Sequence, residues 1–466
     1  MSSYLNKLPP PPPPPRAASG AVPTSDDASP AHLAPLAPRM GHKSAKSLSG
    51  HYNDAPDLDI VRQPSQKRSR ATSRVAAALN PSPSPSNEAS TTPSSSAGSS
   101  TPAVQTADTI LPAFTAPPPP PPEPTLDRRY GPLPGDFYHP ADVLFFDQID
   151  QSLPSKLILL FIPGNPGLVG FYRFFLTALR DALPAHLRSQ TKVYAVGHLR
   201  HTPDFKEDRG FNPQHLPSLQ DQVTDKVTFV DLVAQTDKLG TPGGPKLVVL
   251  GHSIGAWIGL QMLKERPQYI STVHALFPTI SRMAETPNGR RLSPLFSWWA
   301  LRPVFYSTSA LSYLPTTLAT RLVSLLTGQS GAGAETTAKL VSSPETVVAA
   351  LTMAREELAR VTELDTALLE QYGERLWFYW AAEGGDGWVT EEAVREIEGV
   401  LERKFGEKGS RRRQRCAEGM PHAFVLNEAH SNSLARKCAG WIVEDLAAAG
   451  TTEATEEDSA DATDTA

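Results

Sequence analysis

Residues 247–255 read LVVLGHSIG. Four apolar residues in a row predict a strand that is buried on both faces of a parallel sheet. The strand runs straight into Gly-x-Ser-x-Gly, and an apolar helical pattern follows until Pro267 ends it. Because Gly251 and Gly255 carry no Cβ, the backbone can turn tightly and lift Ser253 above the edge of the sheet. This order of strand, turn and helix predicts a nucleophile elbow, whereas Gly-x-Ser-x-Gly by itself is often a chance match.

Buried strands and helices alternate on both sides of this elbow. Continuous apolar residues predict further strands at 157–162, 192–196, 273–277 and 376–381, with a weaker one at 415–417. A helix over 218–239 is predicted by apolar residues at helical spacing and by a capping box of Ser218 and Asp221. Strands that alternate with helices form right-handed βαβ units. The sequence therefore predicts an α/β fold, with a mostly parallel central sheet and helices on both of its faces.

A serine nucleophile needs a histidine base. With this elbow the chain order is serine, acid, histidine, and the histidines after Ser253 are His274, His422 and His430. His274 falls in a predicted strand close to the elbow, and His430 falls in a predicted helix. His422 follows the last predicted strand in the sequence MPHAF. We therefore predict His422 as the base; an exposed or helix-capping histidine is the alternative.

The acid that orients the base should follow a strand between the serine and the histidine. The predicted strand 376–381 is followed by the loop EGGDGW at 383–388. Glycines on both sides of Asp386 suit a tight loop that directs a carboxylate toward an imidazole. We predict Asp386 as the acid, with Glu383 as the rival. Asp365 is more typical of a helix surface.

An oxyanion hole needs two backbone N–H donors near the nucleophile. One is expected from Ile254, the residue after the serine, and the other from the loop PGNPG at 163–167. Asn165 is the predicted donor in that loop, since proline has no N–H to give. A plain strand-to-helix turn is the alternative for this loop.

The composition divides the chain into three parts. Residues 1–125 hold 26 of the 46 prolines together with runs of Ser, Thr and Ala, which leaves too few apolar clusters to offset the entropy of ordering. We predict a disordered Pro/Ser-rich leader over 1–135, a folded domain over 136–447 and a disordered acidic tail over 448–466. The proline runs favour polyproline II, so the leader either docks to an SH3- or WW-type partner or is simply a solvated extension.

Several classes of protein are disfavoured by composition. The net charge of −5 gives no strongly basic surface for nucleic acid. Cys416 and Cys438 are too few and too far apart for a disulfide framework or a metal cluster, so we expect reduced thiols, no metal and no cofactor. The first residues lack an apolar stretch of signal-peptide length. No 18-residue window is cleanly apolar, so a simple membrane-spanning helix is not expected.

Four motifs carry a resemblance to a known family. They are IPGNPG at 162–167, FY at 171–172, GHSIGA at 251–256 and PHAF at 421–424. Together they resemble the lipid droplet-associated hydrolase family, a branch of the α/β-hydrolase superfamily, over about residues 140–445. The resemblance implies a serine hydrolase of sterol esters or acylglycerols at the lipid droplet surface, with the endoplasmic reticulum or cytosol as a reservoir. It also implies Ser253 as nucleophile, Asp386 as acid and His422 as base. The leader, the tail and the basic run RRRQR at 411–415 have no counterpart in that resemblance.

A cap is expected between the elbow and the acid, over about 282–372. Within it, residues 292–327 contain only Arg302 and Arg321 as charged residues and are rich in aromatics. Such a segment suits a lipid interface, and the residues predicted to contact lipid are Trp298, Trp299, Phe305 and Tyr306. Prolines 294, 303 and 315 are expected to break the segment into two or three short helices. A plain cap over the substrate pocket is the alternative.

Three functions fit these features. The leading hypothesis is hydrolysis of carboxylic esters of apolar lipids through an acyl-enzyme. The second is an acyltransferase, in which an alcohol replaces water at the same site; the choice depends on how the pocket excludes water. The third is a droplet-surface organising protein whose hydrolase site is vestigial. The complete set of serine, acid and histidine favours chemistry over the third reading.

Overall fold

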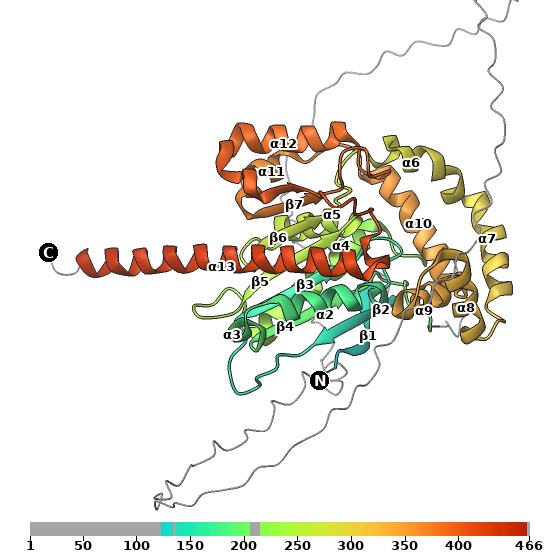
Figure 1. The fold of residues 1–466 in the computed structure, drawn as a ribbon, viewed down its shortest axis with the longest axis horizontal. Helices are drawn as coiled ribbons and strands as arrows, with labels where there is room; N and C mark the ends of the chain where they lie inside the picture. Colours follow the sequence, from blue (N-terminus) through green and yellow to red (C-terminus); the bar gives the residue numbers. More distant parts are fainter. Residues whose placement is uncertain (1–122, 134–136, 206–214, 464–466) are drawn as a thin grey trace, which may run out of the picture. The chain divides into compact units, whose positions relative to one another are not determined.

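The computed structural model describes residues 123–133, 137–205 and 215–463 (Figure 1). Residues 1–122, which include the proline runs predicted as docking segments, lie outside the described residues, as does the end of the predicted tail. Everything below concerns the described part of the chain.

An eight-stranded sheet forms the centre of the fold, in the order β1-β2-β4-β3-β5-β6-β7-β8. The β1–β2 and β2–β4 pairs are antiparallel, and all other neighbours are parallel. The mostly parallel sheet predicted from the sequence is therefore confirmed. The strands are β1 Thr125–Leu133, β2 Phe137–Phe146, β3 Leu157–Ile162, β4 Thr191–Val196, β5 Lys246–His252, β6 Ile270–Leu276, β7 Leu376–Trp380 and β8 Arg413–Arg415.

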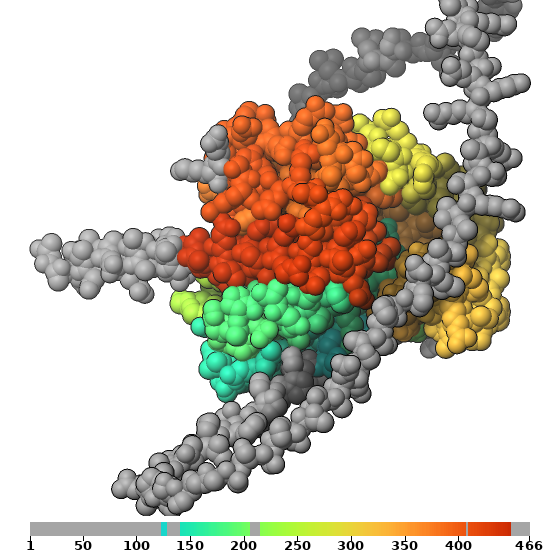
Figure 2. All heavy atoms as spheres, viewed as in Figure 1, coloured from blue at the N-terminus to red at the C-terminus, as the bar shows by residue number. Residues whose placement is uncertain are grey.

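Helices cover both faces of this sheet. One face packs against α2 and α13, which lie side by side in Figure 2, and the other packs against α4, α5, α11 and α12. All six residues of β3 are buried, and they alternate between the two apolar cores as a strand period of two requires. The helices are η1 Val169–Tyr172, α2 Arg173–Ala182, α3 Ala185–Arg188, α4 Leu219–Asp237, α5 Ile254–Glu265, α12 Glu391–Phe405, η6 Gly406–Arg412, η7 Phe424–Leu426 and α13 Glu428–Thr463.

The start of α4 shows how local sequence sets an element. Ser218 caps the helix by accepting from the Asp221 N–H, while the Asp221 carboxylate accepts from the Ser218 N–H. This reciprocal pair satisfies two backbone donors that a helix start would otherwise leave unpaired. The capping box predicted from the sequence is confirmed.

The residues between β6 and β7, where the cap is expected, form a succession of helices. They are η3 Met283–Glu285, α6 Pro287–Leu292, η4 Ser293–Phe296, α7 Trp298–Leu311, α8 Thr316–Thr327, α9 Gly331–Val341, α10 Pro344–Arg360, α11 Thr366–Tyr372 and η5 Gly373–Arg375. Helices α7 to α10 gather at one end of the domain, at the right of Figure 1. Within the described part of the chain, no helix combines the length and the apolarity needed to cross a bilayer.

Two sequence predictions about the bounds of elements are corrected. The leader was predicted to extend to residue 135, but β1 pairs with β2 from Thr125 onward, so the folded part begins earlier. The side chain of Leu126 in β1 is 61% exposed, and the backbone of β1 pairs with β2. The weak strand at 415–417 lies instead at Arg413–Arg415.

The acidic tail and Pro303 also differ from expectation. Helix α13 continues through the predicted disordered tail to Thr463. Pro303 lies inside α7 instead of breaking it. Because proline has no N–H, it removes one backbone hydrogen bond near the start of the helix, the bond to the Trp299 carbonyl oxygen.

Two helical glycines give a matched test of the elbow. A Cβ at Gly255 would overlap the Ile162 carbonyl oxygen, whereas a Cβ at Gly440 meets nothing within 4 Å. We expect Gly255→Ala to lower the free energy of unfolding by at least about 2 kcal/mol, and Gly440→Ala to raise it by about 0.5–1 kcal/mol. Urea unfolding measures both. Equal stability of the two variants would contradict the tight packing of the elbow.

Candidate active site

Ser253 lies between the end of β5 and the start of α5. Its backbone has φ 55° and ψ −124°, a conformation that costs an L-residue free energy and needs support from its surroundings. The Ser253 N–H donates to the Leu276 carbonyl at 3.0 Å, and the Ser253 carbonyl accepts from the Ala256 N–H at 3.0 Å. A Cβ at Gly164 would lie 2.9 Å from the Ser253 Cβ, so the loop after β3 passes directly against the serine.

His422 and Asp386 form a hydrogen-bonded chain with this serine. The His422 Nε2 lies 2.9 Å from the Ser253 Oγ, and the His422 Nδ1 lies 2.7 Å from the Asp386 Oδ2. A carboxylate only accepts, so Nδ1 donates to Asp386 and Nε2 is left to accept from the serine hydroxyl. Asp386 is itself fixed by the Trp388 N–H, which donates to its Oδ1 at 2.7 Å. The structure thus brings together the three side chains chosen from the sequence.

The rival residues lie elsewhere. Glu383 is exposed, and Asp365 caps α11 and pairs with Lys264. His274 is buried in β6, with the Asp445 carboxylate 3.8 Å away, on the face of the sheet that α13 covers. His430 lies in α13. None of these four occupies a position beside Ser253.

The two predicted oxyanion donors flank the serine in the structure. Asn165 lines the same cavity as Ser253, and Ile254 is the first residue of α5. Among the described residues, neither backbone N–H has a hydrogen-bond partner. Two unpaired N–H groups beside a nucleophile, one of them at a helix N-terminus, can stabilise developing negative charge.

The side chain of Asn165 is used for a different purpose. Its Nδ2 donates to the Ala350 carbonyl at 2.9 Å and to the Glu357 Oε1 at 2.8 Å, which ties the loop after β3 to the cap helix α10. Burial raises the pKa of the Glu357 carboxyl to about 8, and the hydrogen bond from Asn165 opposes that rise. The sequence analysis did not identify Glu357; the available signal was its helical register with the buried Ala350 and Met353.

A second hydrogen-bonded chain joins the loop after β3 to the loop that carries His422. The Gly164 N–H donates to the Tyr172 Oη at 3.0 Å, the Tyr172 Oη lies 2.8 Å from the His252 Nδ1, and the His252 Nε2 lies 2.9 Å from the His422 carbonyl oxygen. Burial, and secondarily the nearby His422, lowers the pKa of His252 to about 3. His252 is therefore neutral, so Nε2–H donates to His422 and Nδ1 accepts from the tyrosine hydroxyl. These hydrogen bonds fix the position of the loop after β3 relative to the loop that carries His422.

The serine opens on a cavity of about 480 Å³. Most of the lining is apolar and comes from the cap and from the loops after β3 and β8, for example Phe171, Leu292, Phe296, Leu340, Leu351 and Val425. Ser253, His422, Asn165 and Glu357 are among the few polar groups. An apolar cavity with a few convergent polar side chains suits an apolar ligand that is held by one polar group.

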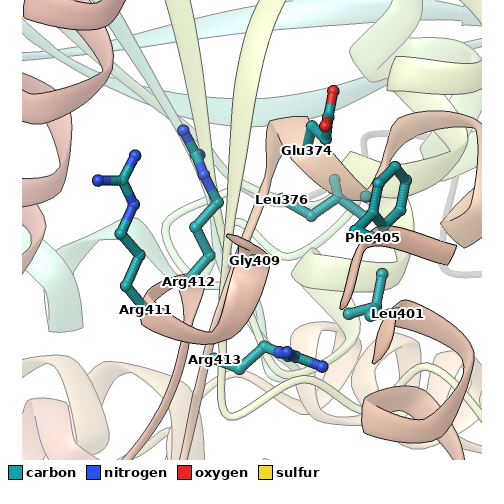
Figure 3. A pocket seen from close by; sticks show the side chains of 9 residues that line it. Glu374, Leu376, Leu401, Phe405, Gly409, Arg411, Arg412 and Arg413 are labelled. Carbon is teal, nitrogen blue, oxygen red and sulfur yellow. The ribbon is translucent and has the colours of Figure 1, made fainter. Parts of the chain in front are cut away.

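Another cavity lies beside β7 and β8 and is lined by Arg411, Arg412, Arg413 and Glu374 (Figure 3). Its arginines are already engaged: Arg411 pairs with Glu444 at 2.7 Å, Arg412 pairs with Asp445, and Arg413 donates to the Glu398 carbonyl. The basic run at 411–415 therefore fastens α12 and α13 to the edge of the sheet. It is a structural feature, separate from the serine.

A mostly parallel sheet with a serine turn after a middle strand, and with an acid and a histidine on loops after later strands, is the arrangement of the α/β-hydrolases. The fold is of that class. The chain belongs to the lipid-droplet associated hydrolase family, whose sequence model matches residues 155–425. The resemblance inferred from the four motifs is confirmed.

Individual relatives carry the same description. A lipid droplet-associated hydrolase of Gallus gallus is 32% identical over 308 residues, which cover 64% of this chain and 87% of the relative. That of Homo sapiens is 29% identical over 310 residues, with 64% and 88% covered. Among solved structures, the haloalkane dehalogenase DatA of Agrobacterium tumefaciens C58 has a TM-score of 0.45 at 12% identity and covers 69% of this chain and 97% of its own.

Glu357 gives the site a pH-dependent stability. Because its pKa is raised in the folded state to about 8, the folded protein binds a proton more tightly than the unfolded chain between about pH 4.5 and 8, so this contribution to stability falls as pH rises. We expect the unfolding free energy of the wild type to fall relative to Glu357→Gln by on the order of 2–4 kcal/mol from pH 5 to pH 9.

The matched control is Glu356→Gln on the same helix, where Glu356 pairs with Arg360 at the surface. The difference in unfolding free energy between Glu356→Gln and the wild type should stay constant with pH. Thermal or urea unfolding at several pH values measures both variants. If the difference in unfolding free energy between Glu357→Gln and the wild type were also constant with pH, the raised pKa of the buried Glu357 carboxyl would be contradicted.

Proposed function

We propose that the protein is a serine hydrolase that cleaves carboxylic esters of apolar lipids, sterol esters or acylglycerols, through an acyl-enzyme on Ser253. The observation that carries this proposal is the 2.9 Å hydrogen bond between the Ser253 Oγ and the His422 Nε2 at the wall of an apolar cavity. Membership of the hydrolase family supports hydrolysis in general. The apolar lining supports an apolar substrate.

The proposed reaction assigns one role to each of these groups. His422 takes the serine proton as the Ser253 Oγ attacks the ester carbonyl carbon, and Asp386 stabilises the imidazolium that forms. The Asn165 and Ile254 N–H groups stabilise the oxyanion of the tetrahedral intermediate. His422 then gives its proton to the departing alcohol, which leaves an ester between the acyl group and Ser253. A water molecule attacks the acyl carbon while His422 takes its proton. The bond from that carbon to the Ser253 Oγ then breaks, His422 gives the proton back to the serine oxygen, and the carboxylic acid leaves.

We propose the lipid droplet surface as the place of action, with the endoplasmic reticulum or cytosol as reservoir. The similar proteins of Gallus gallus and Homo sapiens are lipid droplet-associated hydrolases, which supports the droplet. Further support comes from the cap: Trp298 and Tyr306 are each 72% exposed and Trp299 is 58% exposed, all on α7. Phe305, predicted with them, is half-buried and lines a cavity with Trp298 and Tyr306. Exposed tryptophan and tyrosine side chains favour the headgroup region of a lipid surface.

The catalytic residues are tested by labelling the full chain with a fluorophosphonate. Ser253→Ala should abolish labelling, and His422→Ala should slow it by about a thousandfold or more, since the serine then lacks its base. Asp386→Asn should also slow it strongly, because the imidazole loses its orienting partner. Glu383→Gln, in the same loop, is the control and should label like the wild type. Labelling that survives Ser253→Ala would place the nucleophile elsewhere.

The lipid-contact residues are tested by flotation with phospholipid-coated triacylglycerol droplets. Replacing Trp298 and Trp299 together by alanine should weaken binding by at least about tenfold through loss of buried aromatic area, while fluorophosphonate labelling without lipid stays unchanged. Phe174→Ala, which removes a partly exposed aromatic from α2, is the control. Unchanged flotation of the double variant would rule out α7 as the contact.

A further inference from the structure

The Glu357 carboxyl lies in the wall of the cavity that holds Ser253. The residue is 3% exposed, and its recorded partner among the described residues is the Asn165 side chain. No lysine, arginine or histidine of the described part of the chain forms an ion pair with it. A carboxyl without a cation in an apolar cavity costs free energy. An apolar residue at this position of α10 would pack without that cost.

The two carboxyl oxygens have different surroundings. Oε1 accepts from the Asn165 Nδ2. Oε2 accepts from no described residue, and it is not among the side-chain atoms sealed from solvent without a partner, so it opens on the cavity. The protein therefore presents one carboxyl oxygen to whatever the cavity binds, with its neighbour oxygen held in place by the loop that carries the Asn165 N–H.

A hydroxyl group fits this oxygen in both of its states. An ionised carboxylate accepts a hydrogen bond from a hydroxyl, and a protonated carboxyl donates one to the hydroxyl oxygen. A cation would fit only the ionised form, which burial disfavours. A wholly apolar ligand would leave the oxygen unpaired in either state.

We propose that Glu357 hydrogen-bonds a free hydroxyl that lies close to the scissile ester of the substrate, so that the site selects hydroxyl-bearing ester lipids over esters without one. A monoacylglycerol has this chemistry on its alcohol side, and a hydroxy-fatty acid ester has it on its acyl side. Glu357 is then a specificity-determining residue. The inference rests on the proposed ester hydrolysis and narrows its substrate class.

The test uses two matched pairs of esters with the full-length protein. The alcohol-side pair is 2-hydroxyethyl laurate and propyl laurate, and the acyl-side pair is ethyl 3-hydroxylaurate and ethyl laurate. For one pair, the wild type should show a kcat/KM at least about tenfold higher for the hydroxylated ester. The pair that shows this difference tells whether Glu357 binds a hydroxyl on the alcohol part or on the acyl part of the substrate. Glu357→Leu should bring this ratio to about one. Glu357→Gln, which still offers polar atoms to Asn165 and to a hydroxyl, should keep part of it.

The ratio separates recognition from a structural role. If Glu357 only positioned Asn165, its loss would slow both members of a pair equally and leave the ratio unchanged, which overturns the inference. Glu356→Gln is the control and should keep the wild-type ratio, and fluorophosphonate labelling checks that each variant retains a working serine. A wild type that cleaves both members equally also overturns the inference while the hydrolase stands. If the wild type neither cleaves the esters nor reacts with the fluorophosphonate, both the inference about Glu357 and the proposed hydrolase function are overturned.

Discussion

The backbone of Ser253 is held at φ 55° and ψ −124°, and the rest of the site depends on that constraint. Strain of this kind costs on the order of 1–3 kcal/mol. It is offset by hydrogen bonds to the Leu276 carbonyl and the Ala256 N–H and by the buried strands on either side. The constraint also demands close backbone contacts: Gly255 faces the Ile162 carbonyl, and Gly164 lies against the serine itself. The elbow and the loop after β3 therefore form one packed unit.

Hydrogen bonds extend this unit to the other loops and to the cap. Tyr172 and His252 connect the Gly164 N–H to the His422 carbonyl, so the loops that carry the oxyanion donor and the base are placed relative to each other. Asn165 connects the same loop to α10. A displacement of α10 would therefore move or release the Asn165 side chain, which couples the position of the cap to the geometry at the serine. The position of α10 and the position of the loop that carries the Asn165 N–H are therefore physically linked.

The parts of the molecule that the sequence predicted are those that depend on local pattern. The elbow follows from a strand, a glycine-flanked serine and a helix, and the position of His422 follows from chain order and from its place after a strand. Strand β1 was missed because it exposes Leu126 and gains order from pairing with β2. The acidic composition of the tail gives no sign that α13 extends to Thr463. Helical register with Ala350 and Met353 indicates that Glu357 faces inward, but its contact with Asn165 spans 192 residues, so no local pattern indicates that partner.

In the proposed mechanism, Ser253 carries the acyl group during turnover. The most direct measurement is mass spectrometry of the full chain and its peptides, quenched in acid within a second of mixing with p-nitrophenyl butyrate. We predict a mass increase of one butyryl group, located on the peptide that contains Ser253 and absent from Ser253→Ala. Ester turnover with no adduct, or an adduct on another residue, would contradict it.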